Sequence, residues 1–259
     1  MCHPEVPGGA PPPAITGVEV RIDVVDGPLP ALLVQPAGKS VGAVLLFHDV
    51  YGRSPFYESL TARLASAGFT TLLPDFFFRE GPLSAQTSDA ASERRTRADS
   101  RRMLSDGLSA AEWLREKHPG PVATVGFCMG GNYALAIASE RAGLSTVCFY
   151  GFPGRPIHFA QDKLSPTPID LVPQIRGPVL GFWGDQDEGA GMDNVKRFEA
   201  AMKEHGHDFE LHIYKGVGHG FMAASRLEPG GVAYADACDA WTRTINFLRH
   251  TFAETQNQG

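Results

Sequence analysis

One cysteine of the chain lies in a setting that suits a nucleophile. The segment Gly126-Phe127-Cys128-Met129-Gly130-Gly131 stands between an apolar run and a helical stretch. It has the form of the nucleophile elbow Gly-x-Ser-x-Gly, with cysteine in place of serine. Such a turn strains the backbone of Cys128, and the glycines remove side chains that would collide there. The segment predicts a nucleophile at a helix N-terminus, where the dipole favours the thiolate; the alternative is a buried structural thiol.

An acid and a histidine follow in the order that such a nucleophile needs. The apolar run 178–183 leads into an acidic loop that contains Asp185 and Asp187, and His219 follows a later run between two glycines. We predict that Asp187 is the acid, while Asp185 stays open because a residue at a strand end can also cap a turn. A structural loop histidine is the alternative for His219. The order Cys, Asp, His indicates acyl transfer, in which the imidazole takes the thiol proton and the carboxylate orients the imidazole.

The cysteine pattern argues against two other kinds of site. Cys2, Cys128, Cys148 and Cys238 are widely separated, and no Cys-x-x-Cys spacing occurs. This spacing disfavours both a disulfide scaffold and a zinc site. Acyl transfer by a thiol needs no metal and no organic cofactor, so we expect neither.

The composition is that of a globular protein with a mild negative charge. The chain has 259 residues, of which 43% are hydrophobic and 20% charged, and its formal net charge is −6. This charge argues against a nucleic-acid or membrane-surface partner. No apolar stretch reaches the roughly 18 to 20 residues of a membrane span, and the first residues lack a signal-peptide pattern, so we expect a cytoplasmic protein.

A local cluster of arginines departs from this balance. It lies in residues 93–102 and comprises Arg94, Arg95, Arg97, Arg101 and Arg102. The cluster can be interpreted as the solvated face of a helix or as a rim that attracts anions near the mouth of a site. The sequence leaves both interpretations open.

The elements that must position these residues follow from the hydrophobic pattern. Residues 18–25 alternate apolar and polar, and residues 31–34 follow a turn, which predicts an antiparallel hairpin. Short apolar runs then alternate with helical stretches, as in a parallel sheet covered on both faces. The strand candidates are residues 42–47, 70–74, 122–127, 145–150, 178–183 and 210–214, and the helix candidates are residues 54–68, 89–118 (one or two helices), 132–141, 193–205 and 232–250.

These elements predict an α/β protein with a mostly parallel central sheet, helices on both faces and an N-terminal antiparallel hairpin. This is the architecture of the α/β-hydrolase fold. Residues 1–16 are rich in proline and glycine and are expected to form a flexible arm. Residues 17–252 are expected to form a single domain, and residues 253–259 a tail.

With the elbow, the Asp187 loop and the His219 loop in this order, the chain resembles the dienelactone hydrolase (carboxymethylenebutenolidase) family from about residue 18 to residue 250. The cysteine elbow carries most of this resemblance, since most α/β hydrolases use serine. The resemblance implies that Cys128, Asp187 and His219 are the catalytic residues of a hydrolase.

Residues 45–52, Leu-Leu-Phe-His-Asp-Val-Tyr-Gly, resemble the family's stretch after the third strand. This implies that Asp49 lies beside the thiol and modulates it, although its side chain is one methylene shorter than the glutamate often found there. It also implies that Val50 offers a backbone N–H to an oxyanion hole, which Met129 completes. A turn or cap residue is the alternative for Asp49.

Residues 73–79 resemble the family's Pro-Asp-x-x-x-Arg segment. The resemblance implies that Arg79 helps to hold a substrate carboxylate, a task that suits a guanidinium fork. A surface ion pair is the alternative. The family's second carboxylate-binding arginine would fall at Ala223, a departure that weakens the case for the dienelactone itself.

These residues predict a hydrolase of small activated esters or lactones that bear a carboxylate and that form a thioester acyl-enzyme. The alternatives are a general small-acyl esterase or thioesterase and a non-catalytic binding protein with this fold. The expected partner is the small-molecule substrate, and the expected state is a monomer or small homo-oligomer.

Overall fold

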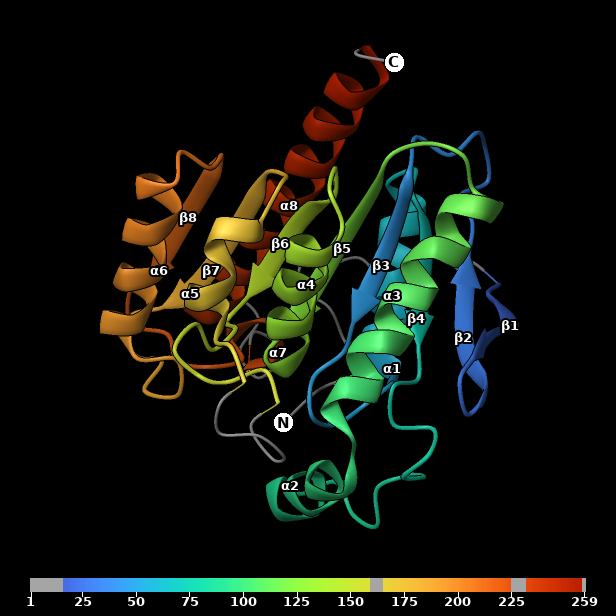
Figure 1. Cartoon of the computed structure of the whole chain (residues 1–259), viewed down its shortest axis with the longest axis horizontal. Coiled ribbons are helices and arrows are strands. Elements are labelled where there is room, and N and C mark those ends of the chain that lie inside the picture. The colour runs from blue at the N-terminus through green and yellow to red at the C-terminus, as the bar shows by residue number, and fades with distance from the viewer. Residues whose placement is uncertain (1–15, 159–164, 225–231, 258–259) are drawn as a thin grey trace.

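The computed structural model describes residues 16–158, 165–224 and 232–257, so most of the predicted arm lies outside it. The described residues form one eight-stranded sheet in the order β1-β2-β4-β3-β5-β6-β7-β8 (Figure 1). The hairpin of β1 and β2 pairs antiparallel with the rest of the sheet through β4, and all further pairings are parallel. The strands are β1 (Val18–Val24), β2 (Gly27–Val34), β3 (Ala43–Phe47), β4 (Thr70–Pro74), β5 (Val122–Phe127), β6 (Ser145–Phe149), β7 (Val179–Gly184) and β8 (Phe209–Tyr214).

Helices cover both faces of this sheet (Figure 1). Every residue of β3 is buried, and successive side chains point to opposite faces. Val44 packs in a core with residues of α1 and α8, while Leu45 packs in a second core with residues of α3 and α4. The helices are α1 (Pro55–Ser66), α2 (Ser88–Arg97), α3 (Ser100–Lys117), α4 (Met129–Glu140), α5 (Pro168–Leu171), α6 (Met192–Glu204), α7 (Phe221–Ala224) and α8 (Val232–Asn257), with a short 3-10 helix η1 (Val172–Gln174).

The predicted mostly parallel sheet, its covering helices and the N-terminal hairpin are thus confirmed. The stretch 89–118 forms two helices because Ala98 is extended and Asp99 caps the next helix, accepting hydrogen bonds from the backbone N–H groups of Arg101 and Arg102. α8 continues through Asn257, beyond the expected end at residue 250.

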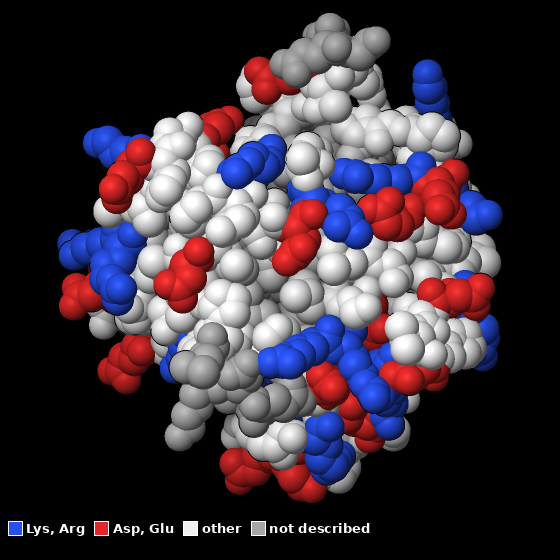
Figure 2. All heavy atoms as spheres, viewed as in Figure 1, with Lys and Arg blue, Asp and Glu red and all other residues white. Residues whose placement is uncertain are grey.

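The surface charge fits the mild net charge of the sequence. On the face shown in Figure 2, acidic and basic side chains are interspersed, and neither sign covers a large area. None of the helices in the described ranges is long and apolar enough to cross a membrane.

Candidate active site

The predicted nucleophile lies in a strained turn between β5 and α4. The backbone of Cys128 has φ 57° and ψ −122°, in the region that non-glycine residues rarely adopt. A Cβ atom on Gly126 would come within 2.1 Å of the Gly130 carbonyl oxygen, and one on Gly130 within 2.5 Å of the His48 carbonyl oxygen. Both glycines are therefore required for this packing, and the turn leaves the Cys128 side chain partly exposed.

The parallel sheet brings three loops to Cys128. Because β5, β6, β7 and β8 run in the same direction, their carboxyl ends lie at one edge of the sheet, where α/β proteins place their sites. Cys128 follows β5, Tyr150 follows β6, Asp187 follows β7 and His219 follows β8. The topology therefore explains how residues that are distant in sequence meet.

Asp187 is the acidic partner of His219. Its Oδ2 lies 2.8 Å from His219 Nδ1, and its side chain is wholly buried. The other carboxylate oxygen accepts a hydrogen bond from the backbone N–H of Ala190 at 2.9 Å. Asp185, the alternative from sequence, accepts the backbone N–H of Gly216 at 2.7 Å and thus ties two loops together. The geometry places Asp187, and not Asp185, on the imidazole.

The imidazole of His219 also interacts with Cys128. Burial by itself lowers the pKa of His219, but hydrogen bonds to Asp187 and Cys128, together with their negative charges, raise it to about 10. The site thus favours a proton on the imidazole when both neighbours are ionised. An imidazole flanked by a carboxylate and a thiol has the arrangement needed for nucleophilic catalysis.

This raised pKa predicts a pH-dependent stability. The pKa of His219 rises from its ordinary value of 6.5 to about 10 in the folded protein, so its stabilising effect is complete below pH 6.5 and disappears as the pH approaches 10. We expect the difference in the free energy of unfolding between the wild type and His219→Gln to decrease as the pH rises from 6.5 to about 10. Urea unfolding followed by circular dichroism at several pH values measures the difference. A constant difference, or one that grows with pH, would contradict the assignment.

Two aromatic side chains that the sequence analysis did not single out form a wall of the site. The Tyr150 ring meets the His219 ring edge-on, with centroids 5.1 Å apart, and the Phe152 ring stacks on it at 4.9 Å. Tyr150 has a positive φ of 40°, so the backbone is strained beside Cys128 at a second position. Both residues come directly after β6, and the carboxyl ends of parallel strands lie at one edge of the sheet. Their position in the sequence could therefore have indicated that they lie at the site.

The predicted oxyanion loop, residues 48–52, is fixed by buried groups. Phe76 N–H donates to His48 Nε2 at 3.2 Å, so the ring proton lies on Nδ1, which donates to the Asp49 carbonyl oxygen at 2.8 Å. Burial is the main cause that lowers the pKa of His48, which keeps the ring neutral. Arg94 Nη2 donates to the Val50 carbonyl oxygen at 3.1 Å. The loop is therefore held from two sides.

Asp49 takes part in the turn of this loop. Its Oδ1 accepts a hydrogen bond from the Tyr51 backbone N–H at 2.8 Å, the geometry of a capping residue. Met129 begins α4, so its N–H belongs to the helix-terminal groups that have no partner within the helix. The roles of Asp49 at the thiol and of Val50 and Met129 in an oxyanion hole remain predictions.

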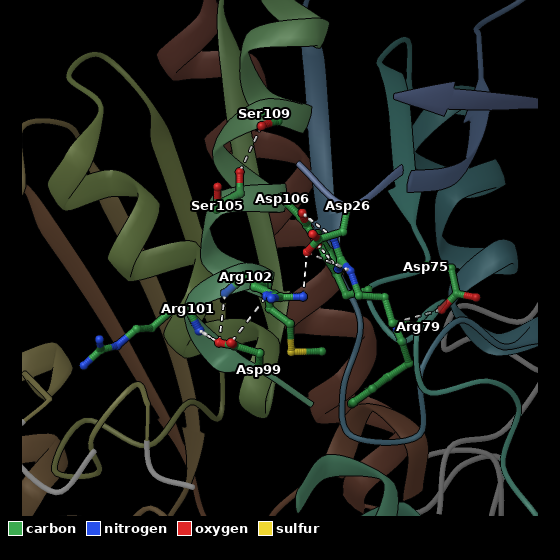
Figure 3. A network of polar contacts seen from close by, with 12 residues as sticks. Asp26, Asp75, Arg79, Asp99, Arg101, Arg102, Ser105, Asp106 and Ser109 are labelled. Atoms are coloured by element: carbon green, nitrogen blue, oxygen red, sulfur yellow. Dashed lines mark hydrogen bonds and ion pairs between the residues drawn. The ribbon is translucent and has the colours of Figure 1, made fainter. Parts of the chain in front are cut away.

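Arg79 is engaged in a network between α3 and the β1–β2 turn (Figure 3). Its two terminal nitrogens contact the Asp106 carboxylate at 2.6 and 3.2 Å, and its Nε lies 3.8 Å from Asp26. The pKa of Arg79 is raised, first by the hydrogen bond to Asp106. Binding of a substrate carboxylate by Arg79 remains a prediction, and the Asp106 carboxylate competes for the same guanidinium.

The described part of the chain contains no group of three His, Cys, Asp or Glu side chains that could hold a metal ion. The site contains the thiol of Cys128, the imidazole of His219 and the carboxylate of Asp187. The N-terminal N–H groups of α4 follow directly after Cys128. These are groups for acyl transfer.

Comparisons with known proteins agree with this chemistry. The family model described as "Dienelactone hydrolase family" matches residues 29–252. A carboxymethylenebutenolidase of Rhodococcus opacus is 32% identical over 251 residues, covering 96% of each chain, and carboxymethylenebutenolidase 2 of Cupriavidus pinatubonensis is 32% identical over 225 residues, covering 86% of this chain and 88% of that protein. The crystal structure of a dienelactone hydrolase from Anabaena variabilis, 23% identical, superposes with a TM-score of 0.63 over 93% of this chain and 98% of that one, which shows a common fold.

Proposed function

The chain belongs to the dienelactone hydrolase family and is a hydrolase of esters or lactones; from this premise we propose that it cleaves small activated substrates through Cys128, His219 and Asp187. The observation that carries the proposal is the place of His219, which is paired with Asp187 and has its pKa raised in part by Cys128. Asp187 Oδ2 lies 2.8 Å from one ring nitrogen, and the Cys128 side chain is close enough to the same imidazole to help raise its pKa.

In the first half of the reaction His219 takes the proton of the Cys128 thiol, and the sulfur attacks the carbonyl carbon of the substrate. A carbon–sulfur bond forms, and the carbonyl π electrons move to the oxygen. The N–H groups of Val50 and Met129 are proposed to bind this oxyanion, a contribution of about 3 to 4 kcal/mol in comparable sites. When the tetrahedral intermediate collapses, the leaving oxygen takes the proton from His219, and a thioester remains on Cys128.

In the second half His219 removes a proton from water, and the hydroxide attacks the thioester carbonyl. A second tetrahedral intermediate forms at the same N–H groups and collapses with loss of the thiolate. The carboxylic acid product leaves, and the proton on His219 returns to the sulfur. Asp187 keeps the reactive nitrogen of His219 directed at Cys128 in both halves.

The sulfur nucleophile limits the range of substrates. A thiolate is a good nucleophile and also a good leaving group, so its adduct with an unactivated amide reverts to the starting materials. Enol esters, lactones that release a delocalised enolate, and aryl or thiol esters release a better leaving group. We therefore propose activated esters and lactones, rather than peptides, as the substrate class.

A general small-acyl esterase is the second candidate, and one observation favours it. Arg79, the residue expected to select a carboxylate, is paired with Asp106. Without another cationic group at the site, neutral and anionic esters of equal reactivity would be cleaved at similar rates.

Trapping of the acyl-enzyme tests the proposed function. The protein is mixed with an activated aryl ester, quenched in acid within the first turnovers and digested for mass spectrometry. We expect the acyl mass on the peptide with Cys128, whereas the buried Cys148 and the partly exposed Cys238 serve as internal controls. Hydrolysis without any acyl mass on Cys128, or equal labelling of Cys238, would count against the thioester mechanism.

A further inference from the structure

The N–H of Val50 belongs to a peptide group whose carbonyl oxygen is held by two donors. This oxygen is the carbonyl oxygen of Asp49, which accepts hydrogen bonds from His48 Nδ1 at 2.8 Å and from the backbone N–H of Gly52 at 3.0 Å. The carbonyl and the N–H of a trans peptide lie in one plane and point in opposite directions. The two hydrogen bonds therefore fix the direction in which the Val50 N–H points.

This N–H is a donor that the described part of the chain does not use. No described residue accepts a hydrogen bond from it, and Val50 is half-buried. The loop that carries it begins against the first turn of α4, since a Cβ atom on Gly130 would come within 2.5 Å of the carbonyl oxygens of Phe47 and His48. Gly130 is two residues from Cys128. The N–H of Val50 is thus held in a loop that packs on the helix end bearing the nucleophile.

The ring of His48 is itself held in one arrangement. It is 1% exposed, and the backbone N–H of Phe76 donates to its Nε2 at 3.2 Å. The rings of Tyr57, Phe76 and Phe77 surround it, with centroids 6.2, 5.5 and 5.6 Å away. The imidazole therefore cannot turn over or exchange its proton between the two nitrogens without losing a buried hydrogen bond. It connects the segment after β4 with the peptide group that follows β3.

We propose that His48 is a positioning residue of the oxyanion hole, whose Nδ1–H orients and polarises the peptide group between Asp49 and Val50. The inference rests on the proposed function, in which the Val50 N–H binds the oxygen that becomes negative. Hydrogen bonds in a chain polarise one another, so a peptide whose carbonyl oxygen accepts from the imidazole is a stronger N–H donor. The benefit is greatest in the transition state, where the substrate oxygen carries negative charge. His48 acts through this peptide group and needs no contact with the substrate.

Two amide side chains separate the two nitrogens of the ring. In His48→Asn the amide nitrogen occupies the place of Nδ1 and donates to the Asp49 carbonyl oxygen. In His48→Gln the amide oxygen occupies the place of Nε2 and accepts from the Phe76 N–H, but the donor to Asp49 is lost. We expect His48→Gln to lower kcat for an activated aryl ester by about ten- to a hundredfold, less than the roughly hundred- to thousandfold loss of a whole oxyanion donor. KM should change by less than about threefold, and His48→Asn should keep kcat within about threefold of the wild type.

Val50→Pro tests whether His48 acts through this N–H. Val50 is the second residue of the turn that the hydrogen bond from Gly52 to Asp49 closes, a position that proline favours, so the substitution removes the N–H and suits the turn. Val50→Ala keeps the N–H and is the matched control. We expect Val50→Pro to lower kcat by about a hundred- to a thousandfold. Addition of His48→Gln to Val50→Pro should then lower kcat by less than about twofold, because both substitutions remove the same interaction.

His207→Asn controls for a general loss of stability. His207 Nε2 lies 2.8 Å from the carbonyl oxygen of Val172, and His207 precedes β8, at the edge of the sheet opposite to the carboxyl ends. The variant loses a bond between a histidine and a backbone carbonyl, as His48→Gln does. We expect a lower melting temperature with kcat unchanged. If His48→Gln does not fold, His48→Phe, which fills the same space without polar atoms, takes its place.

The outcomes separate this inference from the proposed function. The positioning role is wrong if His48→Gln keeps the wild-type kcat, if His48→Asn loses as much as His48→Gln, or if the full loss persists in the Val50→Pro background. In each of these cases a low kcat of Val50→Pro leaves the proposed oxyanion hole intact. If Val50→Pro is as active as Val50→Ala, the proposed hole is wrong, and the positioning role is overturned with it. Retained activity in His48→Asn, a loss in His48→Gln and no further loss in the double variant support the role.

Discussion

Cys128→Ala is expected to lower kcat/KM for an activated aryl ester by about a thousandfold or more, since removal of the nucleophile from a catalytic unit leaves only binding and oxyanion stabilisation. Release of the aryl alcohol, followed by absorbance, measures this loss. The small side chain preserves the elbow, although it also retains the unfavourable φ of 57°. The circular dichroism spectrum and melting temperature of the variant should therefore stay close to those of the wild type.

Cys238→Ala is the matched control for this change. Cys238 is the other partly exposed cysteine of the described chain and lies in α8, away from the elbow. Its replacement should leave kcat/KM unchanged. Substantial activity in Cys128→Ala, in a preparation free of contaminating esterase, would mean that another group is the nucleophile.

Asp187→Asn is expected to lower kcat by roughly ten-thousandfold, the loss seen when the acid of such a unit is replaced. The carboxylate now accepts a hydrogen bond from His219 Nδ1 at 2.8 Å, which leaves the other ring nitrogen free to take a proton. An amide that donates to Nδ1 would favour the opposite tautomer. The proton transfer from Cys128 would then be lost, while the size and packing of the buried side chain change little.

Asp185→Asn provides a close comparison because it is two residues away in the same loop. The Asp185 carboxylate accepts the Gly216 N–H and contributes no contact to the imidazole. We expect it to reduce thermal stability slightly and to keep kcat within about threefold of the wild type, the range of surface substitutions. If Asp185→Asn inactivates the enzyme and Asp187→Asn does not, the assignment of the acid must be exchanged.

The regular elements could be predicted because their patterns are local. The mostly apolar runs at β3 to β7 indicated strands covered on both faces, and the alternating residues 18–25 indicated the hairpin. The ends of the elements were less certain, because they depend on single contacts. The sequence pattern placed Gly27 in the turn. In the structure β2 begins at Gly27, because this residue pairs with Val24 across the hairpin.

The candidate site was predictable in part, for a related reason. The sequence shows the glycines around Cys128 and His219 and the apolar strand before Asp187. It does not show the contacts of Arg79, which depend on a residue far away in the chain, or those of Asp49, which depend on the exact conformation of a turn. Arg79 meets Asp106 across 27 positions, and Asp49 bonds within its own loop. Likewise, the arginine cluster of residues 93–102 was ambiguous because its members differ in burial: Arg94 is buried and bonds to the Val50 carbonyl oxygen, whereas Arg97 is exposed and pairs with Glu93.

The positive φ angles of Cys128 and Tyr150 have a consequence for how this protein tolerates change. Each such angle disfavours the folded state by about 1 to 3 kcal/mol, a considerable part of the 5 to 15 kcal/mol that a typical domain has in reserve. Glycine at either position would relax the backbone but would delete the thiol or the ring beside His219. Selection for activity therefore keeps the free energy of unfolding below the attainable value. The protein then tolerates fewer destabilising mutations at other positions before it unfolds.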